Sequence, residues 1–255
     1  MMNQRLAFVW FYWSAGASGD ELRWSIGSVV SFYQGEAVPI VLGDRPGWYD
    51  GIHIDCRRIE PILFRRYYDT LNKLRLACEH YAVPDEFIWM MDDSYWVRPF
   101  DYSDAVRPRH CGLVSDQEVE DMRSGNRWNQ LKHHTFSALR ARGHPTCDYA
   151  TPHSPQHVTK ANAASLFERW TFAGQPLIWN LLYGNLYYPQ QAQPTHEIYW
   201  VLKPRSANEI QVGLRAEHRI LNSASNAWNG GLRSFLSALL LNRTPRKPGT
   251  SGVHD

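Results

Sequence analysis

The chain has 255 residues and is 44% hydrophobic, enough to bury a core, which excludes disorder or collagen-like order for most of its length. Its 27 Lys and Arg residues against 25 Asp and Glu residues give a formal net charge of +2, which excludes a global positive field that would recruit nucleic acid or membrane. Aromatic residues are numerous, with 11 Trp, 13 Tyr and 10 Phe. We therefore expect some of them to line a groove or to stack on planar ligands.

The first hundred residues alternate between strand and helix patterns. Apolar runs predict buried strands over 6–13, 38–43 and 52–55 and over the segment 86–101, which runs into two adjacent carboxylates. Helical spacing predicts helices over 21–32 and 63–81. The alternation predicts an α/β fold with an open, mostly parallel twisted sheet flanked by helices. In such sheets ligands bind beyond the carboxyl ends of the strands.

The later residues are less regular. Their patterns predict helices over 116–142, 159–170, 176–186 and 232–241, an extended segment over 147–155 and a strand over 196–203. Because there is no internal repeat and no interior linker, we expect one domain over 1–241, followed by a flexible basic tail over 242–255.

The cysteines and the early apolar run bear on location. The four cysteines form no C-x-x-C pair and follow no export signal, which predicts free thiols in a reducing compartment. The run over 6–13 is too short for a membrane span. We therefore expect a cytoplasmic protein without a membrane span, and the sequence leaves its oligomeric state open.

Two adjacent carboxylates, Asp92 and Asp93, follow the apolar strand residues 87–91. Such neighbours raise each other's pKa unless a cation neutralises them, and unpaired charges beside a core are costly. Mg²⁺ or Mn²⁺, held by few carboxylates together with diphosphate oxygens, would neutralise them. This context favours a metal site over the alternative, a solvated turn.

The order of several motifs resembles the GT-A fold of nucleotide-sugar glycosyltransferases. The motifs are G-D-E-L-R-W-S-I-x-S-V (19–29), I-x-I-D (52–55), N-K-L-R (72–75) and F-I-W-M-M-D-D-S-Y-W-V (87–97). Their spacing is similar to that of Stealth-type sugar-phosphate transferases and of small phage glycosyltransferases associated with oxidised-pyrimidine DNA modification. The likeness covers residues 6–101, with a weaker match over 151–155. It implies a divalent metal, Mn²⁺ or Mg²⁺, and a nucleotide-diphosphate sugar donor, with a UDP-sugar favoured, and a phage origin would place the protein in the host cytoplasm.

The resemblance implies a set of metal ligands. Asp93, and with it Asp92, would hold the metal on the donor diphosphate, although D-D-S departs from a strict D-x-D motif and leaves open which carboxylate binds directly. Families of this fold bring a late histidine to the metal, so His196 is a candidate ligand. His153 lies in a proline-flanked extended segment and is an alternative ligand, a general base or a turn residue.

The resemblance also implies a donor site built at the strand ends. Asp55 would bond the nucleobase or ribose, and Tyr12 or Trp13 would stack on the base. Lys73 and Arg23 would meet the diphosphate or the donor sugar. On the residues alone, Asp55 would equally cap a turn, Lys73 would be a solvated charge and Trp13 would belong to the core.

The chemistry and the acceptor follow from these parts. An acceptor hydroxyl would attack the sugar carbon, and an inverting route needs a general base, for which the candidates are Asp92, His153, Glu197 and Asp116. A retaining route needs no base at that place, and the sequence does not decide between the two.

The favoured acceptor is a 5-hydroxymethylpyrimidine in phage DNA, reached through aromatic side chains and local basic residues. The basic residues are Arg98, Arg107, Arg109, Arg140, Arg142, Arg243, Arg246 and Lys247. The alternative is a capsular or cell-surface glycan, modified by glycosyl or sugar-phosphate transfer. A non-enzymatic alternative is an aromatic-groove module that binds glycans or nucleic acid.

Overall fold

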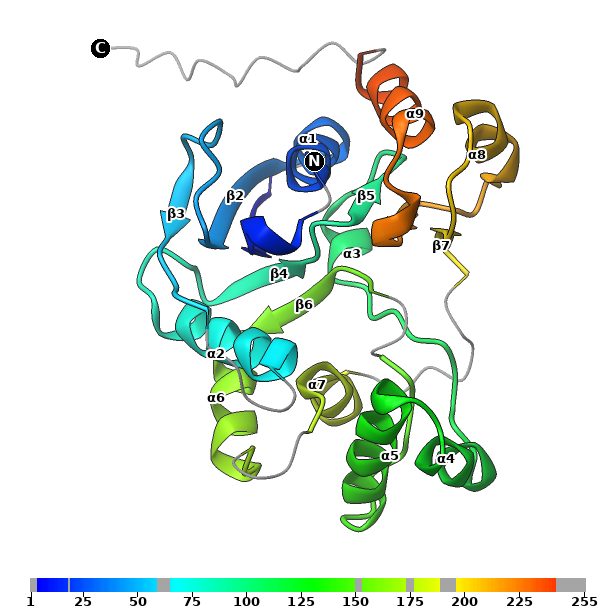
Figure 1. Ribbon diagram of the computed structural model, residues 1–255. Coiled ribbons are helices and arrows are strands. Elements are labelled where there is room, and N and C mark those ends of the chain that lie inside the picture. The colour runs from blue at the N-terminus through cyan, green and yellow to red at the C-terminus, as the bar shows by residue number, and fades with distance from the viewer. Residues whose placement is uncertain are drawn as a thin grey trace.

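The computed structural model describes residues 4–17, 19–58, 65–149, 153–172, 177–188 and 196–241 (Figure 1). Its central sheet has the strand order β3-β2-β1-β4-β6, in which the first three pairings are parallel and β6 runs antiparallel to β4. The α/β class and the mostly parallel sheet are therefore confirmed, and the antiparallel strand is an addition to the prediction. The strands are β1 (Arg5–Tyr12), β2 (Glu36–Gly43), β3 (Ile52–Ile54), β4 (Glu86–Met90) and β6 (Gln156–Thr159).

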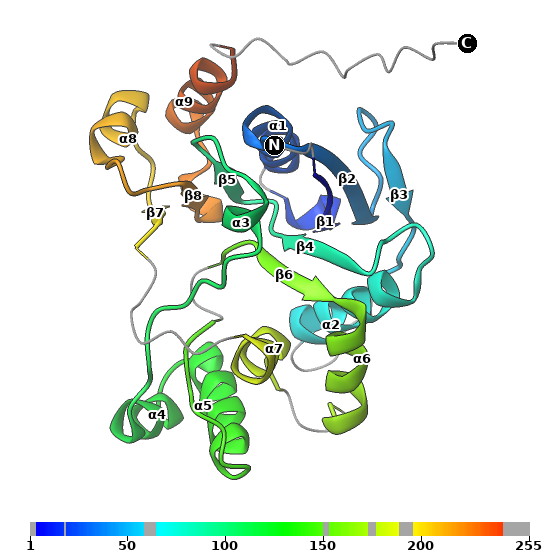
Figure 2. The ribbon, with the colours of Figure 1, turned by 180° about the vertical axis from the view of Figure 1, so that it is seen from behind.

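The strand β1 is buried on both faces, which explains its continuous apolar run. Phe8 and Trp10 belong to a core with the helix α1 (Glu21–Phe32), whereas Val9 belongs to a core with α2 (Arg65–Glu79). These two helices accordingly cover opposite faces of the sheet (Figures 1 and 2). The prediction of a doubly covered first strand is confirmed.

A second, smaller sheet has the order β5-β8-β7, built from β5 (Ser94–Trp96), β8 (Ile220–Ser223) and β7 (Ile198–Val201). The prediction that a buried strand runs into the two carboxylates is confirmed, because β4 ends at Met90. The chain then turns at Asp92 and Asp93, and its apolar continuation is β5 of the other sheet. The two carboxylates therefore lie at the junction of the two sheets. Neither β8 nor the helix α8 (Ala207–Gly213) was predicted.

The remaining predicted helices are found within the described residues, with one change. The segment predicted as a single helix over 116–142 is two helices, because the side chain of Asn126 accepts a hydrogen bond from the Asn129 N–H and starts a new helix. The helices are α3 (Tyr102–Ala105), α4 (Asp116–Arg123), α5 (Arg127–Arg140), α6 (Lys160–Arg169), α7 (Trp179–Tyr187), α8 (Ala207–Gly213) and α9 (Gly230–Leu241).

Three further expectations concern the chain as a whole. All four cysteines are free thiols. Within the described ranges, no helix is long and apolar enough to cross a membrane. The predicted basic tail over 242–255 lies outside the described residues.

The end of β2 depends on a glycine. Gly43 has a φ of 111°, and a Cβ there would lie 2.2 Å from the carbonyl oxygen of Tyr12. Gly143 also has a positive φ, of 74°, but a Cβ there would meet nothing within 4 Å.

We expect Gly143→Ala to lower the free energy of unfolding by about 1 kcal/mol through backbone strain. Gly43→Ala should lower it by about 3 kcal/mol, because a clash adds to the strain. Urea unfolding measures both, and equal losses would contradict the close approach of β2 to β1.

Candidate active site

The strand order of the central sheet reverses between β1 and β4, and the region beyond the carboxyl ends of these two strands is called the crevice below. Moving outward from β1, the chain builds β2 and β3 on one side and β4 on the other. Ligands of open parallel sheets bind where the strand order reverses in this way, beyond the carboxyl ends of the two strands. Tyr12 and Trp13 lie at the end of β1, and Asp92 and Asp93 follow the end of β4. The sequence-predicted carboxylates and aromatic residues are thus brought to the same edge.

Negative charge is concentrated in this crevice. Burial, and then the charges of Asp93 and Glu21, raise the pKa of Asp92 to about 7. Burial, and then the charge of Asp92, raise the pKa of Tyr12. Glu21 is the first residue of α1 and only 4% exposed, and sequence reasoning did not single it out. Its signal was its place directly after Asp20, where the loop from β1 enters the helix.

Asp93 has one carboxylate oxygen without a donor. Its Oδ2 lies 3.6 Å from Nδ1 of His153, whereas Oδ1 is buried and has no hydrogen-bond partner within the described structure. A buried oxygen without a partner is costly. The donor set therefore fits Mg²⁺ or Mn²⁺, which take one or two carboxylates and complete their coordination with water and substrate phosphates. Over the described ranges, no three His, Cys, Asp or Glu side chains converge to hold a metal by themselves.

His153 is held in a strained backbone conformation beside the carboxylates. Its φ is 39°, a left-handed value that residues other than glycine adopt rarely. Its carbonyl oxygen accepts hydrogen bonds from Oγ of Ser94 at 2.7 Å and from Nδ2 of Asn222 at 3.2 Å. Two residues of the second sheet therefore fix the backbone that carries this imidazole.

The His153 ring faces both charge and an aromatic side chain. Its side chain is 42% exposed, and its ring centroid lies 5.7 Å from that of Trp200 on β7. Burial opposes the charged imidazolium, but the hydrogen bond and charge of Asp93, followed by the charge of Asp92, raise the His153 pKa overall. The two carboxylates thus favour the charged form of the imidazole.

Lys73 is buried beneath the strand ends. Its side chain is 1% exposed, its Nζ lies 2.9 Å from Oδ2 of Asp69, and a Cβ on Gly43 would lie 3.4 Å from Nζ. The hydrogen bonds from Ser14, and then the charge of Lys73, lower the pKa of Asp44 at the end of β2. Lys73 therefore supplies positive charge to this edge from below and is not a solvated surface residue.

The ring of Trp13 is already stacked within the protein. The guanidinium carbon of Arg58 lies 3.2 Å from the centroid of its indole, and Gly16 packs so closely that a Cβ there would lie 2.0 Å from the ring. Of the two aromatic candidates for base stacking, the half-buried Tyr12 is the one without such a ring contact in the described structure.

Two other donor-site candidates lie along the same edge. Arg23 is exposed on the first turn of α1, with its guanidinium carbon 5.9 Å from the ring centroid of Trp48. Asp55 is exposed directly after β3, three strand spacings, or about 14 Å, from β4. The row from Asp55 to Asp92 is thus long enough for an extended nucleotide.

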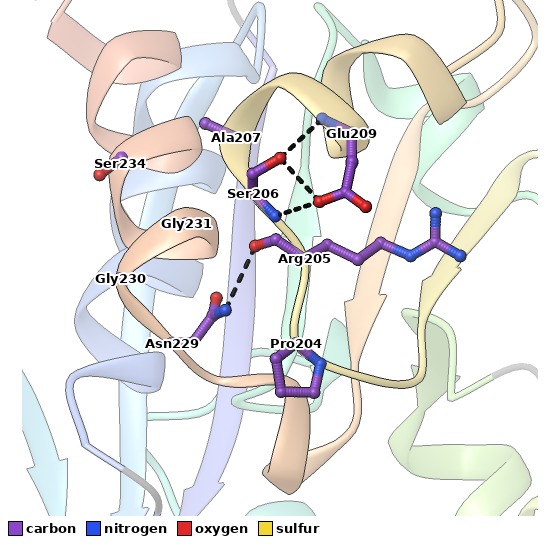
Figure 3. A pocket seen from close by; sticks show the side chains of 9 residues that line it. All are labelled: Pro204, Arg205, Ser206, Ala207, Glu209, Asn229, Gly230, Gly231 and Ser234. Carbon is purple, nitrogen blue, oxygen red and sulfur yellow. Dashed lines mark hydrogen bonds between the residues drawn. The ribbon is translucent and has the colours of Figure 1, made fainter.

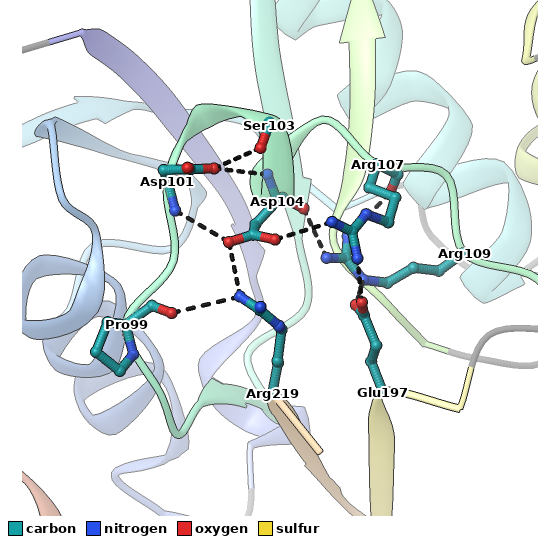
Figure 4. A network of polar contacts seen from close by, with 8 residues as sticks. All are labelled: Pro99, Asp101, Ser103, Asp104, Arg107, Arg109, Glu197 and Arg219. Carbon is teal, nitrogen blue, oxygen red and sulfur yellow. Dashed lines mark hydrogen bonds and ion pairs between the residues drawn. The ribbon is translucent and has the colours of Figure 1, made fainter. Parts of the chain in front are cut away.

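The structure does not bring Glu197 to the carboxylates. Glu197 belongs to an ion-pair network in which it accepts hydrogen bonds from Arg107 and, at 3.2 Å, from Nε of Arg109 (Figure 4). Arg107 and Arg219 also pair with Asp104, at 3.1 and 2.7 Å. These contacts tie the start of β7 to the loop after β5, which gives Glu197 a structural role.

His196 and Asp116 also lie apart from the centre. His196 precedes β7, whereas the β7 residue level with Ser94 is Trp200, four residues or about 13 Å further along the chain. Asp116 begins α4 and pairs with Arg140 at 2.8 Å. His153 is therefore the predicted histidine that the structure sets beside Asp93.

The arginines proposed to track DNA phosphates make contacts within the protein. Arg98 donates to the carbonyl oxygens of Arg215 and His218 in the loop between α8 and β8. Arg142 donates to the carbonyl oxygen of Arg169, with its guanidinium carbon 3.9 Å from the ring centroid of Trp170. Arg107, Arg109 and Arg140 are in the ion pairs described above, and the candidates Arg243, Arg246 and Lys247 lie outside the described residues.

A pocket of about 440 Å³ lies elsewhere, between α8 and the start of α9 (Figure 3). Three of its polar residues cap helices: Ser206 and Glu209 form a reciprocal capping box, and Oδ1 of Asn229 accepts from the Leu232 N–H in the first turn of α9. Figure 3 shows the Arg205 guanidinium extending away from Asn229. The pocket is thus explained by helix ends.

Comparison of the chain with protein-family models gave no match, and comparison with curated proteins gave no relative either. The proposed function therefore rests on the geometry of the crevice and on the sequence motifs.

The raised pKa of Asp92 implies that the stability of the fold depends on pH. A carboxyl whose folded-state pKa is raised to about 7 binds its proton more tightly in the folded chain, so its contribution to stability is lost as pH rises from about 4 to 7. In the presence of a chelator, we expect Asp92→Asn to be more stable than the unmodified protein by about 2 kcal/mol at pH 8 and by much less at pH 5. Asp85→Asn, at the exposed opposite end of β4, is the control. A pH-independent difference in urea unfolding would argue against the charged cluster.

Two arginines of the ion-pair network should differ in their contribution to stability. Arg109 is 2% exposed, whereas the side chain of Arg107 is 42% exposed. Arg109→Ala should cost about 3–5 kcal/mol because it removes the buried partner of Glu197, whereas Arg107→Ala should cost about 1 kcal/mol or less. Thermal and urea unfolding measure both losses, and a small loss for Arg109→Ala would contradict the structural role of the network.

Proposed function

We propose that the chain is a metal-dependent glycosyltransferase of GT-A type, which transfers a sugar from a nucleotide-diphosphate donor to an acceptor hydroxyl. The observation that carries the proposal is the buried, unpartnered Oδ1 of Asp93 in an acidic crevice at the switch point between β1 and β4. A cation would neutralise the acidic side chains there, and a diphosphate is a ligand that shares a divalent cation with few protein carboxylates.

The donor is proposed to lie along the carboxyl edge of the sheet. Asp93 and Asp92 would hold the metal, whose positive charge stabilises the leaving nucleoside diphosphate when bound. Asp55, at the far end of the row, would orient the nucleoside, while Tyr12 lies between. Arg23 from α1 would contact the donor phosphates, and the buried Lys73 would add positive charge without contact.

His153 is proposed to act on the acceptor. With Nδ1 directed at Asp93, its Nε2 is the atom that takes the proton from the acceptor hydroxyl as the oxygen attacks the sugar carbon. Trp200 beside the imidazole offers an apolar face for an acceptor sugar or base. A base at this place suits an inverting reaction, whereas a retaining reaction would use His153 only to orient the acceptor.

Two acceptors are proposed. A 5-hydroxymethylpyrimidine in DNA is supported by the aromatic residues at the crevice, and a UDP-sugar is the first donor to test. A capsular or cell-surface glycan is supported by a different observation, because five of the arginines proposed to contact DNA phosphates make contacts within the protein instead. They are Arg98, Arg107, Arg109, Arg140 and Arg142.

The test is release of nucleoside diphosphate from UDP-sugars in the presence of Mn²⁺ or Mg²⁺. We expect metal-dependent release, reduced about 100-fold or more in Asp93→Ala, because the metal ligand is removed. Asp85→Ala is the matched control, since it makes the same substitution at the other end of the same strand and should retain full activity.

The outcomes separate the alternatives. No metal-dependent release from any donor, with both acceptors offered, would contradict the transferase. Mass spectrometry of nucleosides from hydroxymethylcytosine-containing DNA distinguishes the acceptors, since an unchanged base mass alongside transfer to a glycan would remove the DNA acceptor. Binding of these ligands without turnover would favour an aromatic-groove binding module.

A further inference from the structure

A buried serine of α1 contacts the turn that carries the two carboxylates. Ser25 is fully buried, and its Oγ lies 2.9 Å from Nε1 of Trp10 on β1. The same oxygen lies 2.6 Å from the carbonyl oxygen of Ser94 and 3.3 Å from that of Met91. Met91 and Ser94 are the residues immediately before and after the Asp92–Asp93 pair.

The hydrogen bonds of this hydroxyl have only one consistent direction. The indole N–H of Trp10 can only donate, so Ser25 Oγ must accept from it. The single hydroxyl hydrogen then remains for the two carbonyl oxygens that flank the carboxylates, of which that of Ser94 is the nearer. Because Oγ accepts from Trp10, its hydrogen is directed to the carbonyl oxygens, and this hydrogen bond holds the turn in place.

The opposite side of the turn is held by the second sheet. The Ser223 N–H on β8 donates to the carbonyl oxygen of Asp93 at 3.1 Å. The backbone around Asp92 and Asp93 is thus held between α1 and β8. Side chains on a turn fixed from both sides keep their separation, which is what a metal site with few protein ligands requires.

We propose that Ser25 is a positioning residue for the metal-binding carboxylates, acting through the backbone of the turn and not through contact with metal or substrate. This inference rests on the proposed function, since it assigns Ser25 a task at the same site. Replacing the hydroxyl should change metal affinity more than it changes the fold.

The chain offers a matched control one turn along the same helix. Ser28 is equally buried, and its Oγ accepts from the Trp96 N–H at 3.0 Å and donates to the Ser25 carbonyl oxygen at 2.7 Å. It binds the backbone of β5 beyond the carboxylates. Its removal should therefore cost stability of the same kind without displacing the turn.

The experiment is a titration of the full chain with Mn²⁺ at saturating UDP, followed by the EPR signal of free Mn²⁺, with circular dichroism to confirm folding. We expect Ser25→Ala to weaken Mn²⁺ binding about 10–100-fold, the range found when groups that orient metal ligands are removed. Ser28→Ala should change it by less than about threefold, and Ser25→Thr, which retains the hydroxyl, should restore most of the affinity. If Ser25→Ala does not fold, Ser25→Cys replaces it, because it keeps a similar volume and weakens the hydrogen bonds.

The possible results separate the role of Ser25 from the existence of the metal site. Unchanged Mn²⁺ affinity in folded Ser25→Ala or Ser25→Cys, or an equal loss in Ser28→Ala, would overturn the role of Ser25 while leaving the metal site intact. Absence of Mn²⁺ binding by the unmodified chain would overturn the proposed function and the role of Ser25 together. Loss of binding in Asp93→Ala but not in Asp85→Ala confirms that the titration reports on the crevice.

Discussion

Two like charges at the end of a doubly buried strand are the constraint on which the architecture depends. Asp92 and Asp93 cannot continue β4 into the core, because uncompensated carboxylates are costly beside apolar side chains. The chain turns at them and enters a second sheet, so the carboxylates lie at the junction of both sheets. Glu21 adds a third negative charge from α1, and Asp93 Oδ1 has no donor within the described structure. A cation satisfies this arrangement, and it is the physical basis of the proposed chemistry.

The surroundings of the carboxylates serve to keep this turn in place. Ser25 holds its backbone from α1, and Ser223 holds it from β8. Ser94 and Asn222 also hold the carbonyl of His153 in a strained conformation. Buried polar groups that are satisfied in this way specify one geometry, because each alternative geometry leaves a donor or acceptor without a partner. Backbone strain of the kind seen at His153, beside the turn that carries the two carboxylates, is typical of a functional site.

Local patterns were enough to predict β1, α1, α2 and the position of the carboxylate pair, because these depend on apolar periodicity and on contacts between neighbouring elements. The second sheet was missed because β8 pairs with β5 across more than a hundred residues, and its short apolar segment carries no period that distinguishes it. The same limit explains why two residues expected at the candidate site lie elsewhere. Glu197 resembles a general base and His196 a metal ligand by residue type. The register of β7, however, sets Trp200 beside His153, and Glu197 pairs with arginines. Ser25 had no signal, since a serine inside an amphipathic helix is ordinary until its partners are known.

The proposed function requires the crevice between β1 and β4 to bind a divalent metal together with a nucleoside diphosphate. Anomalous diffraction from crystals grown with Mn²⁺ and UDP tests it most directly. We expect an anomalous peak at the Asp93 carboxylate, with the diphosphate beside it and the nucleoside directed along the strand ends toward Asp55. A nucleotide bound away from this edge, or a crevice without Mn²⁺ in crystals that contain the nucleotide, would contradict it.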